Sequence, residues 1–276
     1  MTANRGASAR DGAHGGVAYT VVGERGPGVL LLHPAFTDAR VFDGLVARLG
    51  DRYRFVVVDL PGHGRSARAA ARARRSAPAD AVAAIVGILD LEAIDATHLV
   101  GVSLGGLVAQ EVARRFPSRV RSLTAVGTYP AGDPVAARAQ RGEMLRWLPL
   151  LLFAMPRFRR YVARTSTATD AGRRRFLELA QGFARAGFAA MGELTPKGGA
   201  QPEGPSAWPL HIVVGEHDLP VVRDAALRWH EREPRSRFEE VAQAGHVVPL
   251  DAPEAFADAL AAWIDEVEAR RDAGGC

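Results

Sequence analysis

The chain has 276 residues, of which 47% are hydrophobic and 24% charged, a composition typical of a soluble globular protein long enough to form a sizeable core. No window reaches the roughly 18 unbroken apolar residues that a membrane span needs, and the single cysteine, Cys276, excludes an internal disulfide or zinc cage. Almost all the positive charge behind the net charge of +4 is arginine, dispersed apart from residues 65–75 and 173–175, and no aromatic platform for nucleic acid is interleaved with it. We therefore expect no membrane and no nucleic acid as partners, and a cytoplasmic location because residues 1–16 lack an export signal.

Short apolar runs alternate with segments of helical period over residues 1–129, a pattern typical of βα units and a mostly parallel sheet. The Gly-rich N-terminus leaves little sequence for a strand before Val17. The segment Arg65–Arg75 is predicted to be a solvated loop or the start of a helix. The expected strands are Val17–Val22, Gly28–Leu32, Phe55–Val58, Thr97–Val102 and Val120–Val126, and the expected helices are Asp38–Leu49, Asp80–Leu91 and Leu104–Phe116.

The pattern changes between Pro130 and Pro209, where amphipathic, Arg-rich pieces predict a mainly helical insertion. Its end, Thr195–Pro209, is rich in Gly and Pro and is predicted to be a linker back to the sheet. The insertion carries Trp147, Phe153, Met155, Phe158, Tyr161, Phe176, Phe183, Phe188 and Met191. Beyond it we expect strands at Leu210–Val214 and Arg237–Val241 and helices at Val221–Arg232 and Pro253–Glu268.

The most informative motif is Gly101-Val102-Ser103-Leu104-Gly105-Gly106, a G-x-S-x-G sequence between an expected strand and an expected helix. A sharp strand-to-helix turn exposes its central side chain, and glycines two positions away relieve the crowding. The same turn places the N–H of Leu104 at a helix N-terminus, where developing negative charge is favoured. The motif therefore predicts Ser103 as a nucleophile.

A serine nucleophile needs a neighbouring base, and that base needs a carboxylate to orient it. His246 follows Gly245 in a loop after an expected strand, and we predict that it is the base. Asp218 also follows an expected strand, and it is the preferred acid. Glu216 and Asp133 are the alternative acids. All these loops lie at carboxyl ends of strands, where open α/β sheets place their sites.

An oxyanion hole requires a second N–H besides that of Leu104, from the loop after the strand that ends near His33. Pro34 has no N–H and cannot donate. Ala35 is the first choice and Phe36 the second. The Phe36 side chain would alternatively line an acyl pocket or pack in the core.

With these motifs the chain resembles the α/β-hydrolase superfamily, and within it cofactor-free enol-lactonases, haloperoxidase-like esterases and C–C bond hydrolases. The similarity is carried by the nucleophile motif with its helix, by Asp59–Ser66, by Gly215–Asp218 and by Ala244–His246. It implies a Ser103-His246-Asp218 triad, an eight-stranded sheet, and a cap formed by residues 130–209 over a core of residues 1–129 and 210–276. His33-Pro34 replaces the His-Gly that is usual in the superfamily.

We expect a serine hydrolase that cleaves a carboxylic ester or lactone of a small-molecule substrate and that uses no metal or organic cofactor. Ser at position 103 argues against epoxide hydrolases and haloalkane dehalogenases, which resemble this chain but use a carboxylate nucleophile. A C–C bond hydrolase and an acyltransferase would use the same triad, and a non-catalytic receptor could share the fold. His63 is expected to be chiefly structural. The sequence leaves the oligomeric state open.

Overall fold

The computed structural model describes residues 8–73, 80–194 and 206–274. The end of the Arg65–Arg75 segment, most of the predicted linker Thr195–Pro209, and Cys276 lie outside these residues. No helix within the described ranges is both long and apolar enough to cross a membrane.

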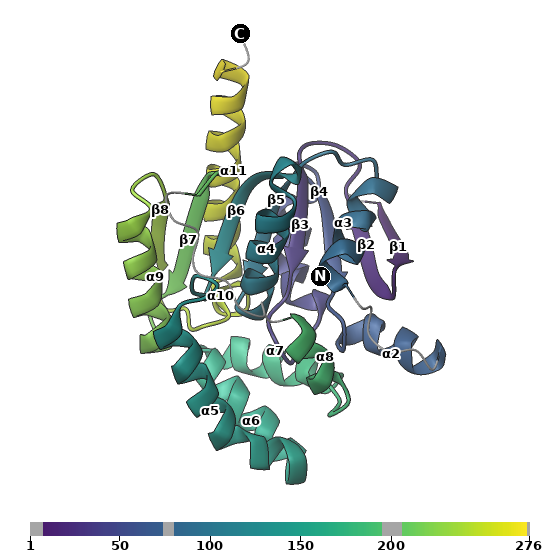
Figure 1. Cartoon of the computed structure of the whole chain (residues 1–276), viewed down its shortest axis with the longest axis vertical. Helices are drawn as coiled ribbons and strands as arrows, with labels where there is room; N and C mark the ends of the chain where they lie inside the picture. The colour runs from purple at the N-terminus through teal and green to yellow at the C-terminus, as the bar shows by residue number, and fades with distance from the viewer. Residues whose placement is uncertain (1–7, 74–79, 195–205, 275–276) are drawn as a thin grey trace.

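A single eight-stranded sheet forms the centre of the molecule (Figure 1). Its spatial order is β1-β2-β4-β3-β5-β6-β7-β8, antiparallel between β1, β2 and β4 and parallel across the rest. The α/β fold with a mostly parallel sheet, predicted from the sequence, is confirmed. The strands are β1 (Ala9–His14), β2 (Val17–Val22), β3 (Gly28–Leu32), β4 (Arg54–Asp59), β5 (Thr97–Val102), β6 (Val120–Val126), β7 (Leu210–Gly215) and β8 (Arg237–Val241).

Strand β1 was not expected from the sequence. Its residues are largely exposed and lack the alternation of apolar and polar side chains that marks a half-buried strand. It forms because its backbone pairs with β2 in the register Ala9 to Val22 and His14 to Val17. An edge strand held by backbone hydrogen bonds leaves little trace in the pattern of side chains.

Helices cover both faces of the sheet because the central strands are apolar on both sides. In β3, Val29 and Leu31 belong to the core under α1 and α11, whereas Leu30 and Leu32 belong to the core under α3, α4 and α9. These helices are α1 (Asp43–Leu49), α11 (Pro253–Gly274), α3 (Ala81–Leu91), α4 (Leu104–Arg115) and α9 (Pro220–Arg232).

Local differences from the sequence-based expectations occur at helix starts. The predicted helix Asp38–Leu49 begins instead as a 3-10 turn, η1 (Ala39–Phe42), with Asp38 as its N-cap, and continues as α1. The segment Arg65–Arg75 agrees with one of its two predicted alternatives, since its described part is helical in α2 (Gly64–Ala73). A second 3-10 turn, η2 (Pro117–Arg119), precedes β6, and a short helix, α10 (Val248–Asp251), precedes α11.

Four helices lie between β6 and β7 in the chain and beyond one end of the sheet, opposite the end where α11 projects (Figure 1). We call them the four-helix segment. No strand of the described residues falls within it. It consists of α5 (Pro134–Phe153), α6 (Met155–Ser166), α7 (Asp170–Ala180) and α8 (Gly187–Leu194).

Candidate active site

Ser103 occupies the sharp turn between β5 and α4. Its backbone has φ 51° and ψ −113°, a left-handed conformation that side chains rarely adopt. The turn is possible because Gly101 and Gly105 flank it: a Cβ on Gly105 would overlap the carbonyl oxygen of Leu32, and one on Gly101 would overlap that of Gly105. Such strain costs on the order of 1–3 kcal/mol and is held only by surrounding structure.

The structure brings Ser103, His246 and Asp218 together from three loops. His246 Nε2 lies 2.8 Å from Ser103 Oγ, and His246 Nδ1 lies 2.7 Å from Asp218 Oδ1. Since a carboxylate only accepts, Nδ1 carries the proton and Nε2 is free to accept from the serine hydroxyl. These distances are the ones that the predicted roles of nucleophile, base and orienting acid require.

The alternative acids have other roles in the structure. Asp133 caps the N-terminus of α5 by accepting from the N–H groups of Val135 and Ala136, both at 2.9 Å. Glu216 accepts from the N–H of Gln243 at 2.8 Å. Of the three carboxylates considered, Asp218 is therefore the one that contacts His246.

The charge of Asp218 changes the protonation of His246. Burial alone would lower the pKa of His246, but the negative charge of Asp218 and its hydrogen bond outweigh burial and hold that pKa above the ordinary 6.5. The Asp218 side chain is fully buried, and its Oδ1 also accepts from the N–H of Leu219 at 2.7 Å. The imidazolium formed during proton transfer would therefore be stabilised where it forms.

The structure separates the two candidate donors for the second oxyanion position. Phe36 has φ 68°, and its N–H donates to His63 Nε2 at 3.2 Å. Ala35, Ser103 and Leu104 line the same cavity. With the Phe36 N–H engaged elsewhere, the geometry favours Ala35 as the partner of Leu104, the first residue of α4, whose N–H has no acceptor within the helix.

His63 and His33 hold two loops together, because each accepts a hydrogen bond from the backbone of the other's loop. Sequence reasoning did not predict these contacts. While His63 accepts from the loop after β3, His33 Nε2 accepts from the N–H of Leu60, in the loop after β4, at 2.9 Å. In each ring the other nitrogen must then donate, His33 Nδ1 to Pro34 O at 2.7 Å and His63 Nδ1 to Pro61 O at 3.0 Å. Burial, reinforced by the neighbouring His33, lowers the pKa of His63 to about 3, so His63 stays neutral.

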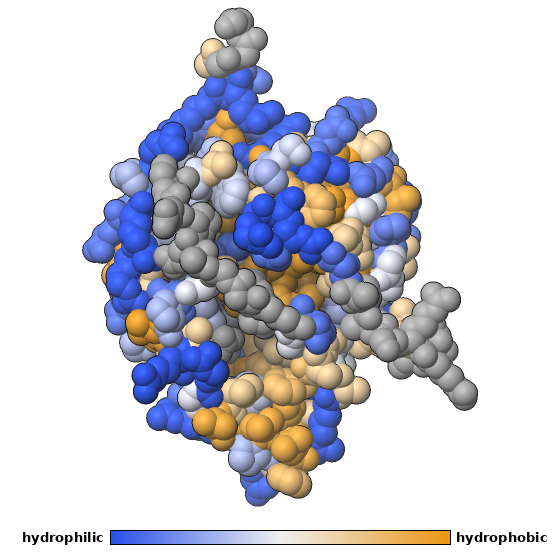
Figure 2. Space-filling model, viewed as in Figure 1, coloured by the Kyte–Doolittle hydropathy of each residue, from blue (hydrophilic) through white to orange (hydrophobic). Residues whose placement is uncertain are grey.

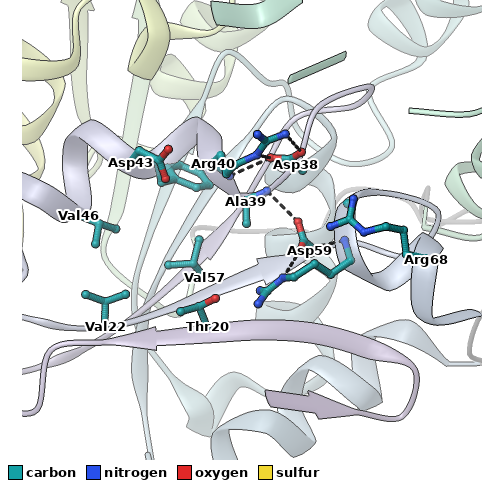
Figure 3. A pocket seen from close by; sticks show the side chains of 13 residues that line it. Thr20, Val22, Asp38, Ala39, Arg40, Asp43, Val46, Val57, Asp59 and Arg68 are labelled. Carbon is teal, nitrogen blue, oxygen red and sulfur yellow. Dashed lines mark hydrogen bonds and ion pairs between the residues drawn. The ribbon is translucent and has the colours of Figure 1, made fainter. Parts of the chain in front are cut away.

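Asp59 also connects the segments that follow β3 and β4, and it lines a second cavity, of about 280 Å³ (Figure 3). Its Oδ1 accepts from the N–H of Ala39 at 2.9 Å, and its Oδ2 accepts from Arg65 Nε at 2.9 Å. The segment that carries Ala35 and Phe36 is thus bonded to Asp59 at the end of β4 and to His63 in the loop after β4. The Pro61-Gly62-His63-Gly64 sequence indicated a tight loop around His63. The sequence could not show that His63 bonds the loop after β3.

We predict that His63→Phe lowers kcat of the ester hydrolysis expected from the sequence by about 10- to 100-fold, with a smaller change in KM. The phenyl ring removes the acceptor of the Phe36 N–H, and displacing an oxyanion donor weakens binding of the transition state more than of the substrate. Steady-state kinetics would measure the split between the two constants.

His63→Gln is the conservative control, because its amide oxygen can accept at the position of Nε2 and should restore kcat. His98→Phe is the matched control for general damage to the core, since His98 is also buried but bonds Ser122 away from the site. Equal losses of kcat in His63→Phe and His98→Phe would contradict a positioning role for His63.

Asp251 holds the loop that carries His246, and it too escaped sequence reasoning. Its Oδ2 accepts from the N–H groups of Gly245 and Ala168, at 2.9 and 2.8 Å. Its Oδ1 accepts from Thr169 Oγ1 at 2.6 Å and from the Thr169 N–H at 2.9 Å. One carboxylate therefore ties the histidine loop to the connection between α6 and α7.

The three side chains Ser103, His246 and Phe36 line a cavity of about 630 Å³. Five of the nine aromatic and methionine residues noted in the insertion contribute to its wall, while Phe158 and Phe183 are buried and Phe153 is 85% exposed. The five residues that line the cavity are Trp147, Tyr161, Phe176, Phe188 and Met191.

Among the described residues, no group of three or more His, Cys, Asp or Glu is arranged to hold a metal ion.

The Phe36 ring connects the loop after β3 with the four-helix segment. It makes edge-to-face contacts with Trp147, Phe158 and Phe183, with ring centroids 5.6, 5.0 and 5.2 Å apart. Phe183 also contacts the His63 ring at 5.1 Å. Such contacts contribute about 0.5–1.5 kcal/mol each beyond the buried area. They clamp Phe36 in its left-handed backbone conformation.

The chain is similar in sequence to known proteins. The model of a family described as the alpha/beta hydrolase family matches residues 29–259. A pimeloyl-[acyl-carrier protein] methyl ester esterase of Aeromonas hydrophila subsp. hydrophila is 41% identical over 108 residues, which cover 38% of this chain and only 39% of the relative.

Two solved structures share the fold. An esterase from Rhodococcus sp. ECU1013 has a TM-score of 0.75 at 19% identity, covering 94% of this chain and 99% of that one. The enol-lactonase from Burkholderia xenovorans LB400 has a TM-score of 0.72 at 20% identity, covering 93% of this chain and 100% of that one. At these identities the similarity establishes the fold.

Proposed function

The chain belongs to the alpha/beta hydrolase family, and on this basis we propose that it hydrolyses a carboxylic ester or a lactone through Ser103, His246 and Asp218. The observation that carries the proposal is the continuous chain of hydrogen bonds from Ser103 Oγ to His246 and on to Asp218. The known esterase and lactonase activities of relatives and structural neighbours favour these two substrate classes.

In the proposed mechanism, Ser103 Oγ attacks the substrate carbonyl and passes its proton to His246 Nε2. The N–H groups of Leu104 and Ala35 hold the oxyanion of the tetrahedral intermediate. As the C–O bond breaks, the imidazolium returns the proton to the leaving alcohol, or to the ring oxygen of a lactone, which stays attached to the acyl group. Water activated by His246 then cleaves the acyl-enzyme, releasing the acid and restoring Ser103.

The four-helix segment would act as a cap over the site. The core that carries the site would consist of residues 1–129 and 210–276. Support comes from the cavity, whose walls come from both parts: Ser103 and His246 belong to the core, while Trp147 and Phe188 belong to the segment. An apolar wall suits an apolar acyl or alkoxy group and excludes bulk water from the acyl-enzyme.

Two measurements test the proposal. In a panel of p-nitrophenyl esters of graded chain length and of lactones, we expect turnover of at least one class. A fluorophosphonate probe should label the wild-type protein and fail to label Ser103→Ala, because the probe reacts with an activated serine. A chain that binds such ligands but is neither labelled nor active would be a receptor, and the proposal would be wrong. Product analysis with added alcohol would separate hydrolysis from acyl transfer.

A further inference from the structure

An exposed apolar stripe runs along the outer face of α5. Leu145 is 69% exposed, Leu152 47% and Phe153 85%, and Pro149 between them is exposed as well. Positions 145, 149, 152 and 153 follow the spacing of one helical face. Large apolar side chains gather there at the lower end of the molecule, over α5 and α6 (Figure 2). A contiguous exposed patch of this kind indicates an interaction surface.

The same region is strongly basic. Residues 134–166, which form α5 and α6, contain seven arginines against one acidic residue, Glu143, a net charge of +6 in a chain whose total is +4. On α6, Arg157, Arg160 and Arg164 are exposed at positions i, i+3 and i+7. None of these three forms an ion pair with another residue of the described ranges. Their charges are therefore available to a partner.

We propose that this α5–α6 surface, formed by the four stripe residues and the three α6 arginines, docks on an anionic phospholipid surface. A basic helix pair with exposed Leu and Phe fits the interface of such a bilayer, where the apolar residues enter the headgroup boundary and the arginines meet lipid phosphates. This mode of binding needs no membrane-spanning helix, so it departs from the sequence-based expectation of no membrane partner, which considered membrane spans alone.

Charge decides against a second copy of the chain as the occupant. A symmetric dimer would place this surface against itself, and two segments of net charge +6 would repel each other. Nucleic acid would match the charge but would leave the apolar stripe in water.

Docking would also deliver apolar esters to the cavity. The opposite face of α5 carries Ala136, Ala139, Glu143 and Trp147, which line it. The helix therefore has one face toward the cavity and the other toward the proposed lipid surface, where apolar esters concentrate.

The test is co-sedimentation of the full chain with vesicles of phosphatidylcholine alone or mixed with equal parts of phosphatidylglycerol. We expect binding to the mixed vesicles only, and its loss as NaCl approaches about 1 M, where the Debye length shrinks to about 3 Å. The Arg157→Gln/Arg160→Gln/Arg164→Gln variant should bind on the order of 100-fold more weakly.

The matched control, Arg25→Gln/Arg232→Gln/Arg235→Gln, removes the same charge from exposed positions elsewhere and should keep its binding. Leu152→Ser/Phe153→Ser should weaken binding about 10-fold or more, whereas Leu91→Ser, at a 60% exposed leucine on α3, should not. The thermal unfolding midpoint of each variant would show that it is folded, and the lipid and salt dependence of the wild type tests the proposal without any variant.

Four results would overturn it: no wild-type binding to mixed vesicles, equal binding to phosphatidylcholine alone, equal losses in the two arginine variants, or a dimer, detected by sedimentation velocity, that Leu152→Ser/Phe153→Ser dissolves. Binding that persists in Ser103→Ala supports docking whether or not the proposed ester chemistry holds.

Discussion

Replacing Ser103 by alanine should lower kcat of the proposed ester hydrolysis by roughly 10⁶-fold, because alanine has no hydroxyl that could form the acyl-enzyme. Alanine keeps the Cβ and therefore the strained left-handed backbone at this position. The free energy of unfolding should change little. A steady-state assay and an unfolding curve on the same preparation would measure both effects.

Ser122→Ala is the matched control for loss of a buried serine hydroxyl. Ser122 is fully buried and bonds His98 away from the cavity, so its replacement should lower stability and leave kcat unchanged. Turnover by Ser103→Ala within tenfold of wild type would mean that the hydrolysis uses another nucleophile, and the proposed mechanism would be wrong.

Replacing Asp218 by asparagine should lower kcat by about 10⁴-fold, because an amide can donate to His246 Nδ1 and stabilise the wrong tautomer. The pH profile should change as well. In the wild type, activity is lost as the pH falls through the raised pKa of His246, since only neutral imidazole accepts the serine proton. Without the charge of Asp218, burial dominates, so the pKa of His246 falls and the acid limb of kcat/KM moves to lower pH.

Asp133→Asn makes the same chemical change at a carboxylate that caps α5, and asparagine is itself a good cap. Its kcat and its pH profile should match the wild type. If Asp133→Asn rather than Asp218→Asn lost activity, the acid would come from the loop after β6 and the assignment of Asp218 would fail.

The aromatic cluster around Phe36 gives the four-helix segment a role in the proposed chemistry beyond covering the cavity. Phe36 is held by rings from α5, α6 and the α7–α8 connection, and its N–H is held by His63. Ala35 directly precedes Phe36 in the chain, so its backbone adjoins these contacts. Packing of the segment and geometry of the loop after β3, which carries the proposed oxyanion donor Ala35, are therefore coupled.

Most strands were predicted from the sequence because buried parallel strands are short, mainly apolar runs that end at a loop signal. Gly28–Leu32, Thr97–Val102 and Val120–Val126 have the predicted bounds. Strand β1 was missed because backbone pairing at a sheet edge requires no side-chain pattern. Helix α10 was missed because four residues are too few to show a helical period.

The strand-turn-helix that presents Ser103 could be predicted from local sequence, because the crowding that requires glycine at position 101 comes from Gly105 and Gly106 of the same turn. The sequence also placed Asp218 and His246 after strands, and so at one edge of the sheet. Tertiary contacts were needed to place Asp218 rather than Asp133 against His246, and to show that the Phe36 N–H is bonded to His63. Both results depend on hydrogen bonds between loops far apart in the chain, and no local pattern of residues encodes such bonds.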